Sequence, residues 1–165
     1  MATSPTAISS PTPTRGDQLP QFTGETPTGG TIRLRDFYMR RNLALVFSDG
    51  PDYAASRDLL RGLAERRAAV QAEAGETLAV ISGDSAVVRE LITTLALPFP
   101  VVVDADNAIH QRYGLLDAAG VPRAAIFLVD RFGTVFETSL ASEDRPIMNA
   151  SEVPGWLEFI ACRCT

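Results

Sequence analysis

The stretch from residue 42 to residue 60 constrains the fold of this chain more than any other. It begins with an apolar run over residues 43–47, whose length is typical of a β-strand buried on both faces. The next four residues, Ser48-Asp49-Gly50-Pro51, have the composition of a turn. A helical pattern then starts near Pro51, because proline is well tolerated in a first helical turn. This order of strand, turn and helix predicts an α/β fold whose reactive corner lies at the start of that helix.

The rest of the chain continues to alternate between strand and helix patterns. Further strands are predicted at residues 77–81, 99–104, 124–129 and 134–138. Helices are predicted over residues 51–74, 86–96 and 107–113, with a last helix capped by Ser151. Short alternating stretches at residues 18–22 and 31–34 predict an N-terminal hairpin. Together these patterns predict a mixed central sheet with helices on both faces.

The spacing of apolar residues assigns an inner face to three of these helices. The expected inward residues are Leu59, Leu63 and Val70 in the first, Val87, Leu91 and Leu95 in the second, and Val153, Trp156, Leu157 and Ile160 in the last. These side chains are expected to pack on the sheet.

Composition limits the organisation and the partners. We expect one domain over residues 15–165, preceded by a disordered tail over residues 1–14 that is rich in Ser, Thr and Pro. The net charge of −5 offers no basic patch for nucleic acid and disfavours anionic membranes. No apolar run approaches the ~18 residues of a membrane span, and the N-terminus lacks the pattern of a secretory signal. The sequence therefore predicts a cytoplasmic protein without a membrane span.

Four segments, taken in order, resemble the peroxiredoxin-like redoxins of the alkyl hydroperoxide reductase/thiol-specific antioxidant group. They are residues 16–22 (GDQLPQF), 81–85 with 97–104 (ISGDS and LPFPVVVD), 113–115 (YGL) and 127–133 (FLVDRFG). The resemblance covers about residues 16–160 and implies a thioredoxin-like fold. The ending from Trp156 to Cys164 also looks like the tail of some bacterial redoxins.

The sequence departs from this group at the corner, where a peroxiredoxin needs a thiolate nucleophile. One alignment places Ala55 at the family's peroxidatic cysteine and Asp52 at its supporting threonine. A thioredoxin-type alignment places Tyr53 and Ser56 at the two cysteines, followed by Arg57. Neither alignment supplies a sulfur atom, and nearby carboxylates such as Asp52 oppose ionisation of a thiol. Ser56 has no visible base beside it and cannot cycle between redox states.

The arginine or cis-proline that the family carries before the hairpin is also out of step. That position holds Ala124, with Arg123 one residue earlier, where a one-residue slip turns a side chain to the other face of a strand. Arg123 either reaches the corner through a bulge or is a solvated arginine at the strand entry. His110 is the only histidine, and we expect it on the surface or in helix packing. One histidine is too few for a zinc site, so we expect no metal and no cofactor.

Both cysteines of the chain, Cys162 and Cys164, lie at its extreme C-terminus. A Cys-x-Cys pair could close a small disulfide or offer two thiolates to a metal or partner, and Arg163 between them would favour thiolates. The alternative is two thiols on a fraying chain end.

Three hypotheses for function follow from these observations. In the first, the chain is a redoxin that has lost peroxidase activity and acts as a binding or assembly module, with a protein partner or a second copy of itself. In the second, it is a thiol-disulfide oxidoreductase or antioxidant protein that works through Cys162 and Cys164. In the third, the remodelled corner binds another ligand or carries another activity, with Asp52, Tyr53 and Ser56 as its polar lining.

Overall fold

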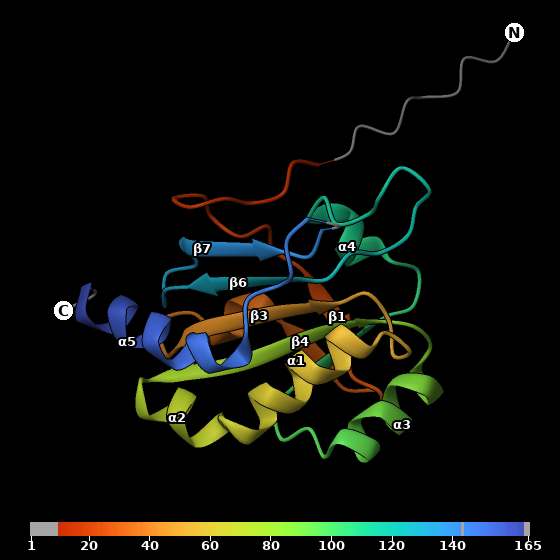
Figure 1. Cartoon of the computed structure of the whole chain (residues 1–165), viewed down its shortest axis with the longest axis horizontal. Helices are drawn as coiled ribbons and strands as arrows, with labels where there is room; N and C mark the ends of the chain where they lie inside the picture. Colours follow the sequence, from red (N-terminus) through yellow and green to blue (C-terminus); the bar gives the residue numbers. More distant parts are fainter. Residues whose placement is uncertain (1–9, 143, 164–165) are drawn as a thin grey trace, which may run out of the picture.

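The computed structural model describes residues 10–142 and 144–163 (Figure 1). Within them, one seven-stranded sheet has the strand order β2-β1-β5-β4-β3-β6-β7. The strands are β1 (Thr23–Glu25), β2 (Thr31–Arg33), β3 (Asn42–Ser48), β4 (Gly75–Ser82), β5 (Val101–Asp104), β6 (Ala125–Val129) and β7 (Val135–Leu140). The α-helices are α1 (Ala54–Glu65), α2 (Arg67–Ala72), α3 (Ser85–Leu95), α4 (Ala108–Arg112) and α5 (Val153–Arg163). Two short 3-10 helices, η1 (Leu34–Phe37) and η2 (Ala150–Glu152), complete the elements.

The centre of the sheet is built from the apolar runs. Strand β3 pairs in parallel with β4 and antiparallel with β6, and every residue of β3 is buried. The predicted strands at residues 43–47, 77–81 and 124–129 are therefore neighbours in one sheet. A strand without an exposed face must be covered on both sides, which explains its continuous rather than alternating apolar sequence.

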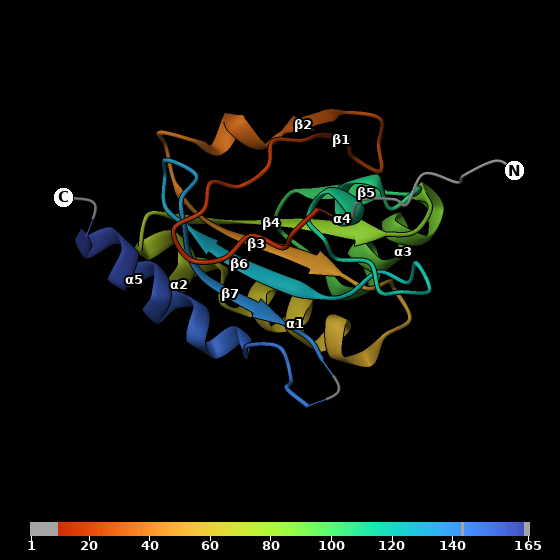
Figure 2. The same ribbon diagram turned by 90° about the horizontal axis from the view of Figure 1, so that it is seen from above.

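Helices cover both faces of the sheet, as predicted (Figure 2). Helices α1, α2, α3 and α5 lie over one face and contribute to one apolar cluster. Helix α4, η1 and the β1–β2 hairpin lie over the other face. The core of this second face holds three aromatic rings in mutual contact, Phe47, Tyr113 and Phe127, with centroids 4.8–5.8 Å apart. The architecture is therefore a three-layer α/β sandwich around a mixed sheet.

Two expected elements differ from the observed ones. The helix expected over residues 51–74 is divided at Arg66, whose backbone leaves helical geometry, so that α1 and α2 follow the sheet as two pieces. The hairpin partner of β2 is β1 and not residues 18–22. Those residues instead pack against the β6–β7 turn, because Leu19 donates its N–H to the carbonyl of Gly133 at 3.0 Å and its side chain is buried.

Helix caps explain two further differences. Asp84 caps α3 by accepting a hydrogen bond from the N–H of Val87. In this helix Val88 is buried and Val87 is exposed, contrary to expectation. Before α5, the cap is Asn149 in a capping box with Glu152, not Ser151. Val153, Leu157 and Ile160 of α5 are fully buried as expected, whereas Trp156 is only partly buried.

Part of the predicted tail contacts the folded domain. The hydroxyl of Thr12 donates to the carbonyl of Gly114 at 3.1 Å, and the hydroxyl of Thr138 donates to the carbonyl of Pro13 at 3.0 Å. Residues 1–9, on which the rest of the predicted tail falls, lie outside the described residues. Over the part of the chain that the structure describes, the helices are too short or too polar to cross a bilayer.

Candidate functional site

The carboxyl ends of the parallel strands β3, β4 and β5 meet at one edge of the sheet. In α/β folds this is the edge where ligands and reacting groups gather. The loop after β3 leads into α1, the loop after β4 leads into α3, and the loop after β5 leads into α4 (Figure 1). The corner predicted from the sequence is therefore at the expected place, at the start of α1.

Internal hydrogen bonds fix the corner itself. Ser56 is 3% exposed, and its hydroxyl donates a short hydrogen bond to the carboxylate of Asp49. The hydroxyl of Ser48 lies 3.2 Å from both the N–H and the carbonyl of Gly50, whose φ of 134° is a conformation that favours glycine. Arg57 closes the turn by donating to the carbonyl of Pro51 at 3.1 Å. The polar groups of the corner thus bind one another.

The other predicted corner residues point to solvent. Asp52 and Ala55 are exposed, and Tyr53, at the N-cap of α1, is 49% exposed and makes no side-chain cap hydrogen bond. Cys162 is exposed near the end of α5, at the opposite end of the domain from the start of α1 (Figures 1 and 2). Cys164 lies outside the described residues. The described part of the chain brings no cysteine to the corner.

Hydrogen bonds to two other segments fix Arg123 just before β6. Its backbone N–H donates to the carbonyl of Leu115 at 2.7 Å, and its guanidinium donates to the carbonyl of Ala141 at 3.3 Å. Among the described residues, the guanidinium makes no hydrogen bond to Asp49 or Ser56. The Arg123 side chain therefore binds the backbone at the end of β7 rather than the corner.

A buried histidine lies at this edge, with hydrogen-bond partners that the sequence did not predict. His110 has no exposed surface, and its Nδ1 lies 2.6 Å from the Asp104 carboxylate while its Nε2 lies 2.9 Å from the carbonyl oxygen of Ser48. Asp104 also accepts hydrogen bonds from the backbone N–H groups of Ile109 and His110, at 3.1 and 2.9 Å. The pair therefore connects the end of β5, through α4, to the end of β3. Of the two positions expected for His110, the surface is excluded and packing of the α4 helix is confirmed, because the ring is buried.

The environment of the pair shifts the pKa of Asp104. Burial raises this pKa, but the hydrogen bonds from the His110 side chain and from two backbone N–H groups outweigh it and hold the pKa below its ordinary value. Both ring nitrogens of His110 face oxygen atoms, one of the carboxylate and one of a backbone carbonyl. The pair is therefore a buried, hydrogen-bonded unit built around an ionised carboxylate. Within the described residues, no group of three histidine, cysteine or acidic side chains is arranged to hold a metal ion.

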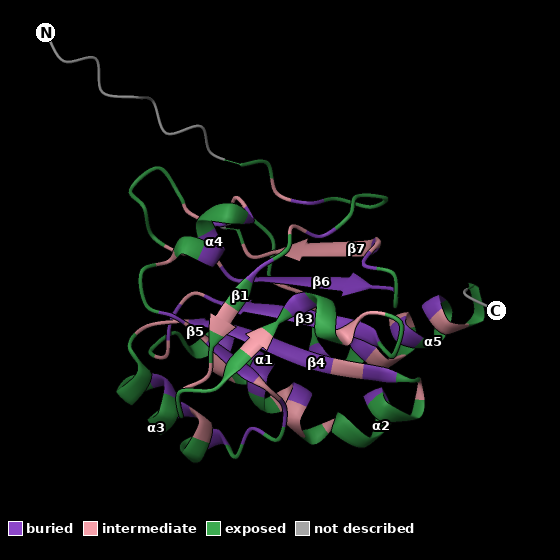
Figure 3. Cartoon of the chain, turned by 180° about the vertical axis from the view of Figure 1, so that it is seen from behind, coloured by how far each residue is buried: buried purple, intermediate pink, exposed green. Residues whose placement is uncertain are grey.

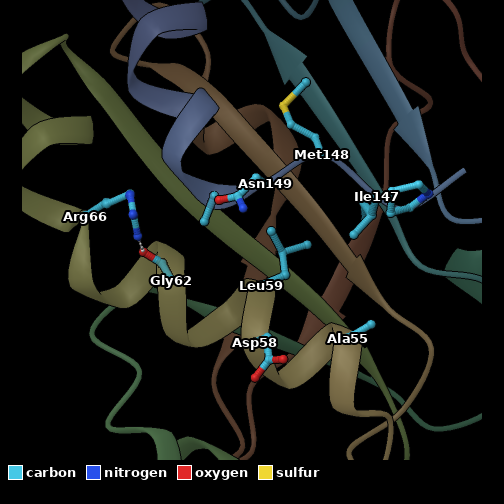
Figure 4. A pocket seen from close by; sticks show the side chains of 10 residues that line it. Ala55, Asp58, Leu59, Gly62, Arg66, Ile147, Met148 and Asn149 are labelled. Carbon is cyan, nitrogen blue, oxygen red and sulfur yellow. Dashed lines mark hydrogen bonds between the residues drawn. The ribbon is translucent and has the colours of Figure 1, made fainter.

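A cavity of about 370 Å³ opens beside the corner, between α1 and the segment before α5 (Figure 4). Its lining is mainly apolar and consists of Ala55, Asp58, Leu59, Gly62, Arg66, Pro146, Ile147, Met148, Asn149 and Ala150. Gly62 permits the two walls to approach, because a Cβ at this position would lie 2.7 Å from the Cβ of Ala150. We call this cavity the α1 groove; it begins at Ala55, which one of the two alignments drawn from the sequence places at the family's cysteine.

The fold and the corner define the class of protein: a thioredoxin-like redoxin domain of the peroxiredoxin type. A model of the AhpC/TSA family matches residues 15–138, which is most of the chain, and the chain belongs to this family. No sequence among curated proteins matches the chain.

Solved structures of redoxins share the fold at low sequence identity. Enterococcus faecalis AhpC superposes with a TM-score of 0.77 at 18% identity, covering 92% of this chain and 96% of its own. Peroxidoxin BcpB from Mycobacterium tuberculosis has a TM-score of 0.76 at 12% identity and covers 92% and 98%. A secreted M. tuberculosis disulfide oxidoreductase homologous to E. coli DsbE has a TM-score of 0.66 at 20% identity and covers 83% and 94%. These similarities confirm the predicted thioredoxin-like fold.

Proposed function

We propose that this redoxin domain does not reduce peroxides at the family's corner and serves instead as a protein-binding module. The observation that carries the proposal is the Ser56–Asp49 hydrogen bond, which fills the corner with a buried hydroxyl and a carboxylate where the family's chemistry requires a thiolate. A hydroxyl held by a carboxylate cannot be oxidised and reduced by the thiol cycle. On this proposal, the chain keeps the redoxin fold but lacks the cysteine sulfur at the corner.

The α1 groove supports a binding role and suggests the partner. Its volume of about 370 Å³ is near the lower end of ligand pockets, and Leu59, Ile147 and Met148 give it an apolar lining. A protein partner that inserts one large apolar or aromatic side chain fits this lining, as such anchors do at the centres of interfaces. The charged side chains of Asp58 and Arg66 border the groove and can contact the polar rim of the partner.

The first half of the test measures peroxidase activity. The parent protein and Cys162→Ser/Cys164→Ser are incubated with hydrogen peroxide and dithiothreitol, and peroxide consumption is followed. We expect neither protein to consume peroxide faster than the reductant alone. Catalytic turnover by the double serine variant would overturn the proposal, since it would place a working site away from both sulfur atoms.

The second half of the test measures docking at the groove. A photo-crosslinking amino acid is placed at Ala55, which lines the groove, or at Ala68, which is exposed on α2 outside it. We expect a discrete crosslinked protein only from position 55, and its loss in Ile147→Glu. Val121→Glu is the matched control, because it adds the same charge at an exposed apolar residue elsewhere. Equal crosslinking from both positions, or insensitivity to Ile147→Glu, would count against a docking groove.

A second candidate function is thiol-disulfide exchange at the C-terminus. Cys162 is exposed, and the guanidinium of neighbouring Arg163 lies 4.8 Å from the centroid of the Phe159 ring, close to the end of α5. This candidate predicts peroxide consumption or disulfide reduction by the parent that is abolished in Cys162→Ser/Cys164→Ser. The same assay therefore separates the two functions.

A further inference from the structure

The β1–β2 hairpin, η1 and α4 lie on the opposite face of the sheet from α1 (Figures 2 and 3). A second cavity, of about 280 Å³, opens between these elements. It is lined by Gln21, Phe22, Thr23, Arg33, Arg35 and Arg112. Half of these residues are arginines, and no carboxylate is among them. We call this cavity the arginine pocket.

In the described part of the chain, no acidic side chain pairs with the three arginines that surround this hollow. Arg33, Arg35 and Arg112 are exposed, and none forms an ion pair within residues 10–142 and 144–163. The chain as a whole carries more acidic than basic residues, with a net charge of −5. Three like charges around one hollow repel one another, so an anion that enters the hollow is stabilised by all three.

The backbone holds these arginines in fixed positions relative to one another. Arg33 ends β2 opposite Thr23 of β1, and Arg35 follows the fully buried Leu34, whose N–H donates to the carbonyl of Phe22 at 3.1 Å. Arg112 ends α4 and donates a short hydrogen bond to the carbonyl of Gln21. Two segments of the chain, residues 33–35 and the end of α4, therefore bring cationic groups to the same place.

We propose that the arginine pocket binds a small phosphate-bearing molecule. Planar guanidinium groups match phosphate oxygens in paired hydrogen bonds, and all fifteen basic residues of this chain are arginine. Gln21 and Thr23 can add neutral hydrogen bonds at the rim, and the buried ring of Phe22 provides an apolar contact.

The volume of the arginine pocket and the net charge of the protein favour a small phosphate-bearing ligand over a nucleic acid. A cavity of about 280 Å³ accommodates a phosphate or diphosphate with a small substituent. The net negative charge of the protein opposes a long polyanion such as nucleic acid. The proposal does not depend on the role of the α1 groove, because the two cavities lie on opposite faces of the sheet.

The test is calorimetric titration of the full chain with inorganic pyrophosphate and, separately, with orthophosphate. The two arms distinguish a diphosphate from a single phosphate as the recognised group. Variants are Arg33→Ala and Arg35→Ala, with Arg67→Ala, an exposed arginine on α2, as the matched control. We expect one of the two anions to bind the parent, and each pocket variant to weaken it about tenfold, since a hydrogen bond to a charged group contributes that much or more. Arg67→Ala should bind like the parent.

Three results would overturn the proposal. They are no heat of binding for either anion at millimolar concentration, unchanged affinity in both pocket variants, and an equal loss in Arg67→Ala, which would indicate general charge attraction. Arg33→Lys sharpens the distinction, because it keeps the charge but loses paired hydrogen bonding. We expect its affinity to lie between those of the parent and Arg33→Ala; parent-like affinity would contradict phosphate-specific geometry.

Discussion

Two polar clusters lie at the same edge of the sheet and differ in almost every physical respect. The corner cluster follows β3 and joins Asp49 to Ser56, surrounded by exposed side chains. The second cluster follows β5 and joins Asp104 to His110 in complete burial. The corner lies where the resemblance to the family predicts the reactive thiolate. The hydrogen bond between Asp104 and His110 was not predicted from the sequence.

We infer from this difference that the buried pair stabilises the edge of the sheet, whereas the corner is the place where a reactive group would lie. His110 reaches from α4 to the last carbonyl of β3, so the buried pair spans the end of β4, which lies between β3 and β5. The corner makes only local bonds within its own turn and the start of α1. Because the hydrogen bonds of the Asp104–His110 pair connect the ends of β3 and β5, we expect that the residues of the corner can be substituted without loss of the fold. The following predictions test this division of roles.

The largest expected effect is that of Asp104→Asn. The substitution replaces a buried carboxylate that accepts hydrogen bonds from the His110 ring and two backbone N–H groups. Loss of such a charge-assisted network typically costs about 3–5 kcal/mol in the free energy of unfolding. Urea denaturation measures it. Asp106→Asn is the matched control in the same loop, where the carboxylate is exposed and accepts one backbone hydrogen bond, and should cost about 1 kcal/mol. Equal losses in the two variants would refute a special role for the buried pair.

The same pair predicts a pH dependence. The pKa of Asp104 is lower in the folded state than its ordinary value of 3.8, so its contribution to stability is fully present above pH 3.8 and is lost as the pH falls through the lowered folded pKa. The stability difference between the parent and Asp104→Asn should therefore narrow as the pH falls below 3.8. Urea midpoints at a series of acidic pH values measure this, and a difference that grows toward low pH would contradict the sign.

A smaller effect is expected for Ser56→Ala. The variant loses one buried hydrogen bond to a carboxylate, which remains partly exposed and can bind water, so the expected cost is about 1–2 kcal/mol. Ser85→Ala, at an exposed serine in the first turn of α3, serves as the control and should change stability by less than about 0.5 kcal/mol. A loss at Ser56 as large as that of Asp104→Asn would remove the distinction between the two clusters.

The smallest effect is expected for Ala55→Cys in the Cys162→Ser/Cys164→Ser background. Ala55 is exposed, so thermal stability should be unchanged. The new thiol would lie near the carboxylates of Asp49 and Asp52, which oppose its ionisation. We expect alkylation by iodoacetamide but no catalytic consumption of peroxide. Turnover would show that only the sulfur atom is missing from the corner.

The sequence predicted the centre of the fold well because burial on both faces leaves a clear signal. The apolar runs that became β3, β4 and β6 could have few other positions in an α/β fold. Arg66, where the first long helix divides, carries no such signal, since neither glycine nor proline marks it. The choice between Val87 and Val88 as the buried residue carries little signal either, because both lie at helical spacing from Leu91 and Leu95.

The functional sites also differ in how far the sequence predicts them. The corner was predicted because its residues are consecutive and follow a recognisable strand. His110 could not be assigned, since its partners are six and 62 residues away and nothing in the spacing relates them. An aspartate that ends a strand shortly before a helix carrying a histidine is the only local hint. The arginine pocket is similar, because only the tertiary fold brings Arg112 of α4 next to Arg33 and Arg35.

The single tryptophan of the chain, Trp156, gives the molecule a built-in optical reporter of one element. It is partly buried on α5 with its ring centroid 6.0 Å from that of Phe159, whereas the aromatic core on the other face contains only phenylalanine and tyrosine. Its emission therefore follows the docking of α5 on the sheet, while far-ultraviolet circular dichroism follows the whole chain. Coincident transitions would show that α5 unfolds with the sheet, and an earlier fluorescence change would show that α5 detaches first.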